Sequence, residues 1–195
     1  LVTVETDMTA WGAAASITMD HQALGAALGA AALNGVPKGG TVLLLDSLPG
    51  DNGIRERMEA AKAVLERERR QARVYKWDPD TTSLPDILRI ERPRAIIAFE
   101  AAALADVAEL SRGEDTFPLL YGCGSTSGIA AALEKGRVTA ITAVNVFSAG
   151  YLAVEAAAAL ARHEDWTAAA PVAFSIVRQE TMYDSDNQKL LFPVT

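Results

Sequence analysis

Short apolar runs recur at regular intervals along the chain, and most of the segments between them have the periodicity of helices. Runs of this length, rich in valine, leucine and isoleucine, are typical of strands buried in a parallel sheet. The predicted strands are Leu1–Glu5, Thr41–Leu45, Arg73–Trp77, Ala95–Phe99, Pro118–Tyr121, Thr139–Val144 and Val172–Val177. Strands that alternate with helices predict an α/β fold, with a doubly wound, mainly parallel sheet and helices on both faces.

Two of the predicted helices carry a clear apolar stripe at spacings of three and four residues. The stripe of the segment Gly53–Gln71 consists of Ile54, Met58, Ala61 and Leu65. The stripe of the segment Phe147–Arg162 consists of Phe147, Tyr151, Val154, Ala158 and Ala161. Each stripe predicts one helix face that is covered by other parts of the protein.

Residues that follow the predicted strands are candidates for a binding site, because ligands of such sheets gather at the carboxyl ends of the strands. Asn145 directly follows Thr139–Val144, and Asn52 lies in the loop after Thr41–Leu45. The candidates chosen on this basis are Glu5, Asn52, Phe99, Glu100, Cys123, Gly124, Ser125 and Asn145.

The stretch GCGSTSG, residues 122–128, joins a predicted strand to a predicted helix, which is also the setting of a dinucleotide-phosphate loop. A dinucleotide fold places this loop after its first strand, with an acidic ribose ligand about 20 residues later. Here the loop follows the fifth predicted strand, the next strand ends without a carboxylate, and no Walker-type Gly-Lys-Ser/Thr follows. A Rossmann-like, nucleotide-dependent enzyme therefore remains only as an alternative.

Other catalytic arrangements are matched no better. Thr126 occupies the central position of a possible Gly-x-Ser-x-Gly elbow, where a hydrolase needs serine. His163 lies at a predicted helix end, and His21 follows Asp20 at a helix start, where aspartate is typical of an N-cap. Cys123 is more typical of a small buried apolar residue than of a nucleophile. Two histidines and one cysteine do not suffice for a usual zinc site. We expect no enzymatic activity, no catalytic residue, no metal and no cofactor.

The net charge and the length of the apolar stretches limit which partners and which locations are expected. The formal net charge of −7 argues against nucleic acid as a partner, because phosphate binding needs a concentrated basic surface. No apolar stretch approaches the ~20 residues of a membrane span. No signal peptide is present, but the chain starts at Leu1 rather than Met, so this absence says nothing about location.

The order of these features resembles the type I periplasmic-binding-protein family, which includes ribose-binding proteins and the effector domains of lactose-repressor-like regulators. The resemblance is carried by LVTVETDMTAWGAAASITMDHQALGAALGAAAL, TVLLLDSLPGDNGIRERMEAAKAVL, PLLYGCGSTSGIAAALEKGRVTAIT and NVFSAGYLAVEAAAAL. Together these stretches span roughly Leu1 to Val177. Their order and spacing, rather than any single motif, carry the likeness.

The resemblance implies a division of the chain into lobes. Residues 1–145 would form a carboxyl-terminal-type ligand-binding lobe, in which Leu1–Glu5 is the strand that crosses between lobes. Residues 146–170 would hold a helix that packs on the other lobe, and residues 171–195 a returning strand and tail. Most of the amino-terminal lobe would be absent. In this family the glycine after the fifth strand, here Gly124, lets the chain turn sharply, and the serines and threonine after it provide a helix N-cap.

The resemblance also assigns roles to single residues. Glu5 falls where sugar binders carry an acidic residue that accepts from ligand hydroxyls. Asp20 and His21 match an Asp–Asn pair, so that His21 replaces an amide that contacts the ligand. Arg57 matches a helix arginine that donates to a ligand oxygen, and a surface salt bridge within RERME is the alternative interpretation.

Three positions depart from the sugar-binding pattern. Phe99, Gly124 and Val144 stand where asparagine, aspartate and glutamine would be expected. Each sugar hydroxyl left unpaired would weaken binding by ~1–3 kcal/mol. A more apolar or aromatic ligand would lose less, because Phe99 could stack on a ring, and Asn145 could replace some of the lost polarity.

The leading hypothesis is non-catalytic binding of a small solute, sugar-like or another metabolite, in a cleft between lobes that close around it. The protein would be the extracytoplasmic substrate-binding component of an ABC transporter or a sensor, with a permease or sensor kinase as partner. The alternative is the effector-binding domain of a lactose-repressor-like regulator, which would be cytoplasmic. If the helix at 147–162 lacks its covering lobe, its apolar stripe favours a homodimer through that helix.

Overall fold

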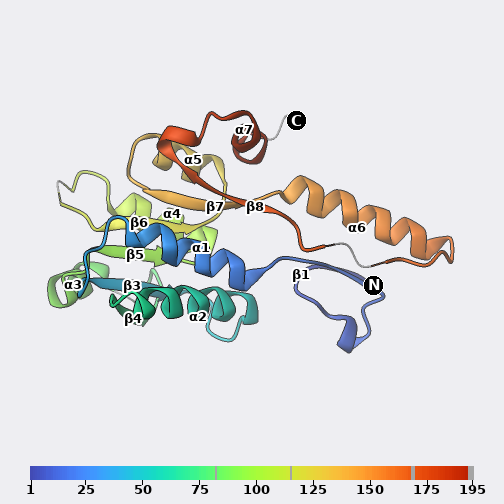
Figure 1. Cartoon of the computed structure of the whole chain (residues 1–195), viewed down its shortest axis with the longest axis horizontal. Coiled ribbons are helices and arrows are strands. Elements are labelled where there is room, and N and C mark those ends of the chain that lie inside the picture. Colours follow the sequence, from blue (N-terminus) through green and yellow to red (C-terminus); the bar gives the residue numbers. More distant parts are fainter. Residues whose placement is uncertain (82, 115, 168–169, 193–195) are drawn as a thin grey trace. The chain divides into compact units, whose positions relative to one another are not determined.

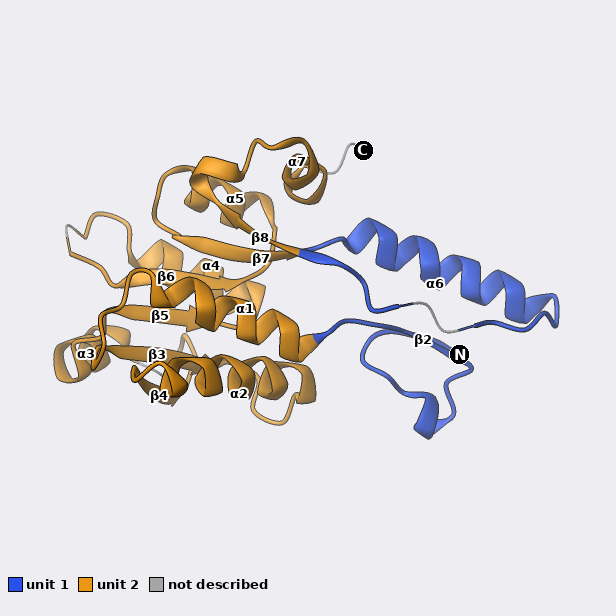
Figure 2. Cartoon of the chain, viewed as in Figure 1, with its two compact units in different colours: residues 1–20, 144–174, 195 blue, residues 21–143, 175–194 orange. Residues whose placement is uncertain are grey.

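The computed structural model describes residues 1–81, 83–114, 116–167 and 170–192, and the chain forms two compact units. Unit 1 comprises Leu1–Asp20 and Val144–Phe174, and unit 2 comprises His21–Ala143 and Ser175–Val194 (Figure 2). None of the described helices is both long enough and apolar enough to cross a lipid bilayer.

A six-stranded sheet organises unit 2 (Figure 1). Its strands are β3 (Thr41–Asp46), β4 (Gln71–Lys76), β5 (Ala95–Ala98), β6 (Leu119–Cys123), β7 (Ala140–Val144) and β8 (Phe174–Arg178). The order across the sheet is β4-β3-β5-β6-β7-β8, and the neighbours from β4 to β7 pair in parallel. The predicted doubly wound, mainly parallel α/β fold is confirmed, with strand boundaries that shift by one or two residues.

Helices follow most strands of this sheet. They are α1 (His21–Leu33), α2 (Asn52–Arg67), α3 (Leu84–Glu91), α4 (Ala101–Leu110), α5 (Ser127–Glu134) and α7 (Ser185–Leu191), with a short 3-10 helix, η2 (Gln179–Thr181). Because successive strand residues point to opposite faces, β3 and β5 serve two separate cores. Leu43 and Ile96 pack with α4 and α5 on one face, whereas Leu44 and Ile97 pack with α1 and α2 on the other. Both faces of the sheet are therefore covered, as the apolar runs predict.

The α1–α2 contact depends on two glycines one helical turn apart. A Cβ added at Gly25 would lie 1.9 Å from the carbonyl oxygen of Arg57, and one at Gly29 would lie 2.8 Å from that of Ala61. Only glycine allows the two backbones to approach this closely. The seam brings the start of α1 against the first turns of α2.

Unit 1 is much smaller. Two short parallel strands, β1 (Val2–Glu5) and β2 (Ala15–Thr18), are joined through the 3-10 helix η1 (Thr9–Trp11) and pack against α6 (Val146–Ala161). Its core consists of Ala15, Ile17, Ala149, Ala156 and Val172. The predicted helix at 147–162 is thus present, shifted by one residue.

The compact units divide the chain differently from the expected lobe of residues 1–145. Residues 1–20 group with α6 rather than with the large sheet, and the chain enters unit 2 directly after β2. The first passage between the units thus follows β2, and the assignment of Leu1–Glu5 as the strand between lobes stays a prediction. β2 is not evident from the sequence because Ala-Ser-Ile-Thr is a short alternation in which only Ala15 and Ile17 are buried.

Candidate functional site

The carboxyl ends of β3, β5 and β6 lie side by side in unit 2. Leu45 pairs with Ala98, and Ala98 pairs with Gly122. The residues that follow these pairs, Phe99 and Cys123 among them, therefore meet at one edge of the sheet. The first turns of α1 and α2 border the same edge through a hydrogen bond from α2 to the Phe99 carbonyl.

His21 and Arg57 form the polar centre of this edge. The Nε–H of Arg57 donates to Nδ1 of His21 at 3.1 Å, and its Nη1 donates to the carbonyl oxygen of Phe99 at 3.0 Å. Both side chains are buried, with 8% of each residue exposed. Arg57 thus ties together the start of α1, the first turns of α2 and the end of β5, and it lies buried rather than at the surface.

This geometry sets the tautomer of His21. An arginine N–H can only donate, so Nδ1 must carry a lone pair, and the neutral ring bears its proton on Nε2. Nε2 is buried and has no hydrogen-bond partner within the described residues. A buried donor without a partner is costly, about 1–3 kcal/mol, and calls for an acceptor.

Gly53 allows the imidazole to lie where it does. A Cβ at position 53 would come within 2.9 Å of Cε1 and 3.0 Å of Nε2 of His21. The preceding Asp51 caps α2, since its Oδ1 accepts from the Ile54 N–H at 2.8 Å. A side chain larger than hydrogen at residue 53 would therefore displace either the ring or this helix start.

The turn after β6 has the predicted backbone role. Gly124 has a φ of 131°, which only glycine adopts readily, and a Cβ there would lie 2.8 Å from Cβ of Ala101. Thr126 caps α5, with its hydroxyl accepting from the Ile129 N–H at 3.4 Å. The glycine-rich stretch thus serves a sharp turn and a helix start.

Two sequence-predicted contacts are corrected by burial. The ring of Phe99 is fully buried in the core with Ile97 and Tyr121, so it does not stack on a ligand, and the carbonyl oxygen is its polar contribution. Alternation along β5 explains this, since residues 97 and 99 point to the same covered face. Cys123 is 6% exposed, and its sulfur accepts from Oγ1 of Thr142 at 3.1 Å, so it belongs to the core as well.

The remaining candidates of unit 2 lie at helix starts. Asn52 is exposed at the first position of α2 and accepts from Arg55 Nη2 at 3.1 Å. Glu100 is half-buried at the N-cap position of α4, where its side chain makes no capping bond. Ser125 is half-buried between Gly124 and the Thr126 cap. The contact of these residues with a ligand stays a prediction.

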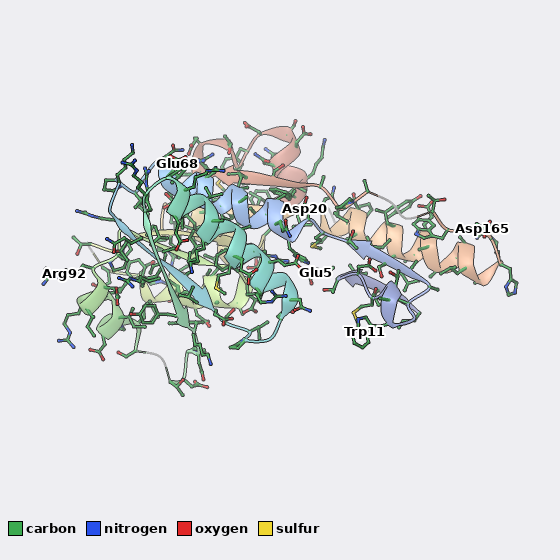
Figure 3. All side chains as sticks on the ribbon, turned by 60° about the horizontal axis from the view of Figure 1, so that its bottom comes forward. Glu5, Trp11, Asp20, Glu68, Arg92 and Asp165 are labelled. Carbon is green, nitrogen blue, oxygen red and sulfur yellow. The ribbon has the colours of Figure 1, made fainter. Side chains whose placement is uncertain are left out.

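Three candidates belong to unit 1. Glu5 ends β1 with a φ of 80° and is exposed, and Asp20 is exposed at the last position of the unit (both labelled in Figure 3). Asn145 caps α6 by accepting from the Ser148 N–H at 2.9 Å, so its carbonyl oxygen is committed to the helix. The structure therefore does not bring all predicted site residues into one unit.

Sequence reasoning missed two features of the site. Gly53 was not recognised, although a glycine at the first position of a predicted helix is an unusual choice that signals close approach. Ser47, directly after β3, has a buried hydroxyl without a hydrogen-bond partner in the described part of the chain. Within the same residues no group of three or more histidine, cysteine, aspartate or glutamate side chains is arranged to hold a metal ion.

Solved structures with the same fold are numerous. An ABC transporter solute-binding protein from Agrobacterium vitis with bound D-fucose is 13% identical, with a TM-score of 0.86 over 98% of this chain and 70% of its own. One from Agrobacterium radiobacter in complex with D-arabinose is 15% identical, with a TM-score of 0.87 over 97% of this chain and 70% of its own. A protein assigned as a LacI transcriptional regulator from Bacteroides fragilis is 13% identical, with a TM-score of 0.77 over 93% and 67%. At these identities the likeness concerns the fold.

The sequence itself matches one family. No curated protein matches the chain. The model of the periplasmic binding protein domain, however, matches residues 1–165, which include α1 to α5, the turn after β6 and all of α6. The chain therefore belongs to the type I periplasmic-binding-protein family.

Proposed function

We propose that the chain binds a small hydroxylated solute without converting it, as the ligand-binding part of an ABC transporter or a sensor. The observation that carries this proposal is the buried Nε2–H of His21, which Arg57 orients and which has no acceptor among the described residues. A hydroxyl or carbonyl oxygen of a solute would supply that acceptor. Solute binding needs no further reactive group, and no bond is made or broken.

A sugar is the ligand class that best fits this chemistry. Hydroxyl groups both donate and accept, so they can pair with the His21 donor and with a carboxylate such as Glu100 at the same edge of unit 2. Structures with the same fold hold D-fucose, D-tagatose and D-arabinose. The burial of the Phe99 ring removes the argument for an aromatic ligand. An extracytoplasmic location and a permease partner follow from the transporter role and are part of the proposal.

A second candidate is the effector-binding domain of a transcriptional regulator. It is supported by the fold likeness to the Bacteroides fragilis regulator. In a regulator, the same site would bind the ligand as a signal for transcription. In a transporter, it would bind the ligand for delivery to the permease. The two roles differ in the partner and in the location, not in the chemistry of His21.

Calorimetric titration of the chain with D-fucose, D-arabinose and D-tagatose tests the proposal, with ATP and NAD as comparison ligands. We expect one or more sugars to bind and His21→Ala to weaken that binding by about tenfold or more, since the lost hydrogen bond to a buried group is worth about 1.4 kcal/mol or more. His163→Ala, which changes the other histidine at an exposed position, is the matched control and should bind normally. Binding of a nucleotide but of none of the sugars would overturn the proposal.

A further inference from the structure

A cavity of about 730 Å³ opens at the amino-terminal edge of the sheet in unit 2, at the opposite ends of the strands from His21. It is lined by the segments that lead into β5 and β6 and by the end of α1. Cavities of roughly 300–1,000 Å³ are the size that holds small organic ligands. The proposed solute site does not involve any of its lining residues.

Two arginines line this cavity on either side of Pro93. Arg92 ends α3 in the left-handed region, with a φ of 46° (labelled in Figure 3), and Arg94 directly precedes β5. Both are exposed, and within the part of the chain that the structure describes their guanidinium groups make no hydrogen bond or ion pair. On the same helix, Arg89 is paired with Asp86 at 2.9 Å. Two unpaired guanidinium groups separated by a single residue give this edge a local positive charge in a chain with a net charge of −7.

The backbone holds both arginines in place. The N–H of Arg92 donates to the carbonyl of Leu88 at 3.0 Å. The N–H of Arg94 donates to Thr41 at 2.8 Å, and the carbonyl of Arg94 accepts from Leu119 at 3.0 Å. Arg94 is thus fixed between β3 and β6, and Pro93 restricts the residue before it. The two charges are presented from a rigid support.

The rest of the cavity wall is mainly apolar. Leu88 and Phe117 are half-buried against the core, and Leu119 is 36% exposed. A second cavity of about 480 Å³ shares Leu88 and Phe117 and continues over Leu110, which is 49% exposed, and Arg89 and Glu114 line it as well. Apolar side chains therefore continue away from the two arginines, in a wall that also carries one charged residue of each sign.

We propose that this edge of unit 2 is a second binding site, for an amphipathic organic anion. The anionic head group would pair with Arg92 and Arg94, whose planar guanidinium groups match a carboxylate or phosphate. The apolar body would lie on Leu88, Phe117 and Leu119. The site requires both parts of the ligand, because the arginines alone are exposed to water and screened by salt.

Octanoate is a suitable probe, because it joins a carboxylate to an apolar chain. Acetate and octanol carry the head group and the tail separately. In an NMR titration of the whole chain we expect octanoate to shift the amide resonances of Leu88, Arg94 and Leu119, and to bind at least about tenfold more tightly than either acetate or octanol. Octyl phosphate tests whether the head-group preference is for phosphate.

The double variant Arg92→Gln, Arg94→Gln should weaken octanoate binding by about tenfold or more. The matched control is Arg55→Gln, Arg67→Gln, which removes the same charge from exposed positions on α2 and should leave binding unchanged. Equal binding of octanol and octanoate, equal loss in the two double variants, or no shift at these amides would each overturn the proposal. The result does not depend on whether any sugar binds.

Discussion

The two units bury their apolar residues in different ways. Unit 2 covers both faces of a six-stranded sheet, and the central residues Leu43, Leu44, Ile96 and Ile97 are all 0% exposed. Unit 1 has two short strands and one helix, and its core is made largely of alanine with Ile17 and Val172. The core side chains of unit 2 therefore bury more apolar surface on folding than the mainly alanine core of unit 1.

The helices show the same difference. One face of α2 is buried and, apart from Arg57, apolar, and the other carries charged pairs such as Arg55–Glu59. In α6 the fully buried residues are alanines and two leucines are half-buried beside them, whereas the aromatic side chains and Val154 point outward. Phe147, Tyr151 and Val154 are 75%, 61% and 69% exposed. The apolar stripe predicted for this helix is thus real, but it is not the stripe that packs within unit 1.

This comparison shows that an apolar stripe predicts burial only where another element is available to cover it. For α2 the seam with α1 and the sheet provides that cover. For α6 the core of unit 1 covers Ala149, Ala156 and Ala159, and Leu152 and Leu160 pack partly buried against it. An exposed patch of large apolar side chains favours association.

The largest effect is expected from a core substitution in unit 2. Leu44→Ala removes a fully buried side chain between the sheet and α1–α2 and should lower the free energy of unfolding by about 2–5 kcal/mol. Val154→Ala makes a related truncation on the exposed face of α6 and should change it by no more than about 0.5 kcal/mol. Chemical denaturation of both variants measures the difference. Equal losses would mean that α6 is covered in solution.

The α1–α2 seam should be the next most sensitive feature. Gly25→Ala places a Cβ 1.9 Å from a backbone oxygen, which cannot rotate away, so we expect a loss of about 1–3 kcal/mol or more. Gly128→Ala, in α5, meets no atom within 4 Å and should be neutral or stabilise by up to about 1 kcal/mol. Thermal unfolding compares the two. A neutral Gly25→Ala would show that the helices separate easily.

The exposed face of α6 should control self-association rather than stability. The double variant Phe147→Ser, Tyr151→Ser removes two large apolar side chains from this face. We expect sedimentation velocity to show less dimer than for the unaltered chain, with a free energy of unfolding within about 1 kcal/mol. A chain that is monomeric at high micromolar concentration before substitution would contradict the predicted homodimer through this helix.

The smallest effect concerns the short 3-10 helix of unit 1. The Thr9 N–H and hydroxyl donate to the Asp7 carboxylate at 2.9 and 2.7 Å, and these bonds hold its pKa below the ordinary value of 3.8. Because the folded-state pKa is lowered, the stabilisation is present above pH 3.8 and is lost as the pH falls through the lower folded value. The amide resonance of Thr9 should therefore titrate with a midpoint below 3.8. In Asp7→Asn this titration should disappear, and a midpoint at or above the ordinary value would contradict the assignment.

The alternation of strands and helices could be read from the chain, because burial on both faces of a parallel sheet leaves continuous apolar runs. The sharp turn at Gly124, the cap at Thr126 and the helix at 147–162 could also be predicted. Each of them depends on residues that are close in sequence. The strand β2 escaped notice because four alternating residues carry little signal. The predicted stacking role of the Phe99 ring was wrong because its burial depends on side chains from other strands and helices of unit 2.

The sequence by itself thus determined the α/β architecture, the local turn chemistry and the family. The tertiary structure decided which groups meet. His21 and Arg57 are 36 residues apart, and only the close approach of α1 and α2 at Gly25 places the Arg57 Nε–H on Nδ1 of His21. It also decided that residues 1–20 pack with α6 and that the outer face of that helix is exposed. The local sequence pattern indicates whether a residue is buried or exposed. Which residue it contacts depends on segments that are distant along the chain.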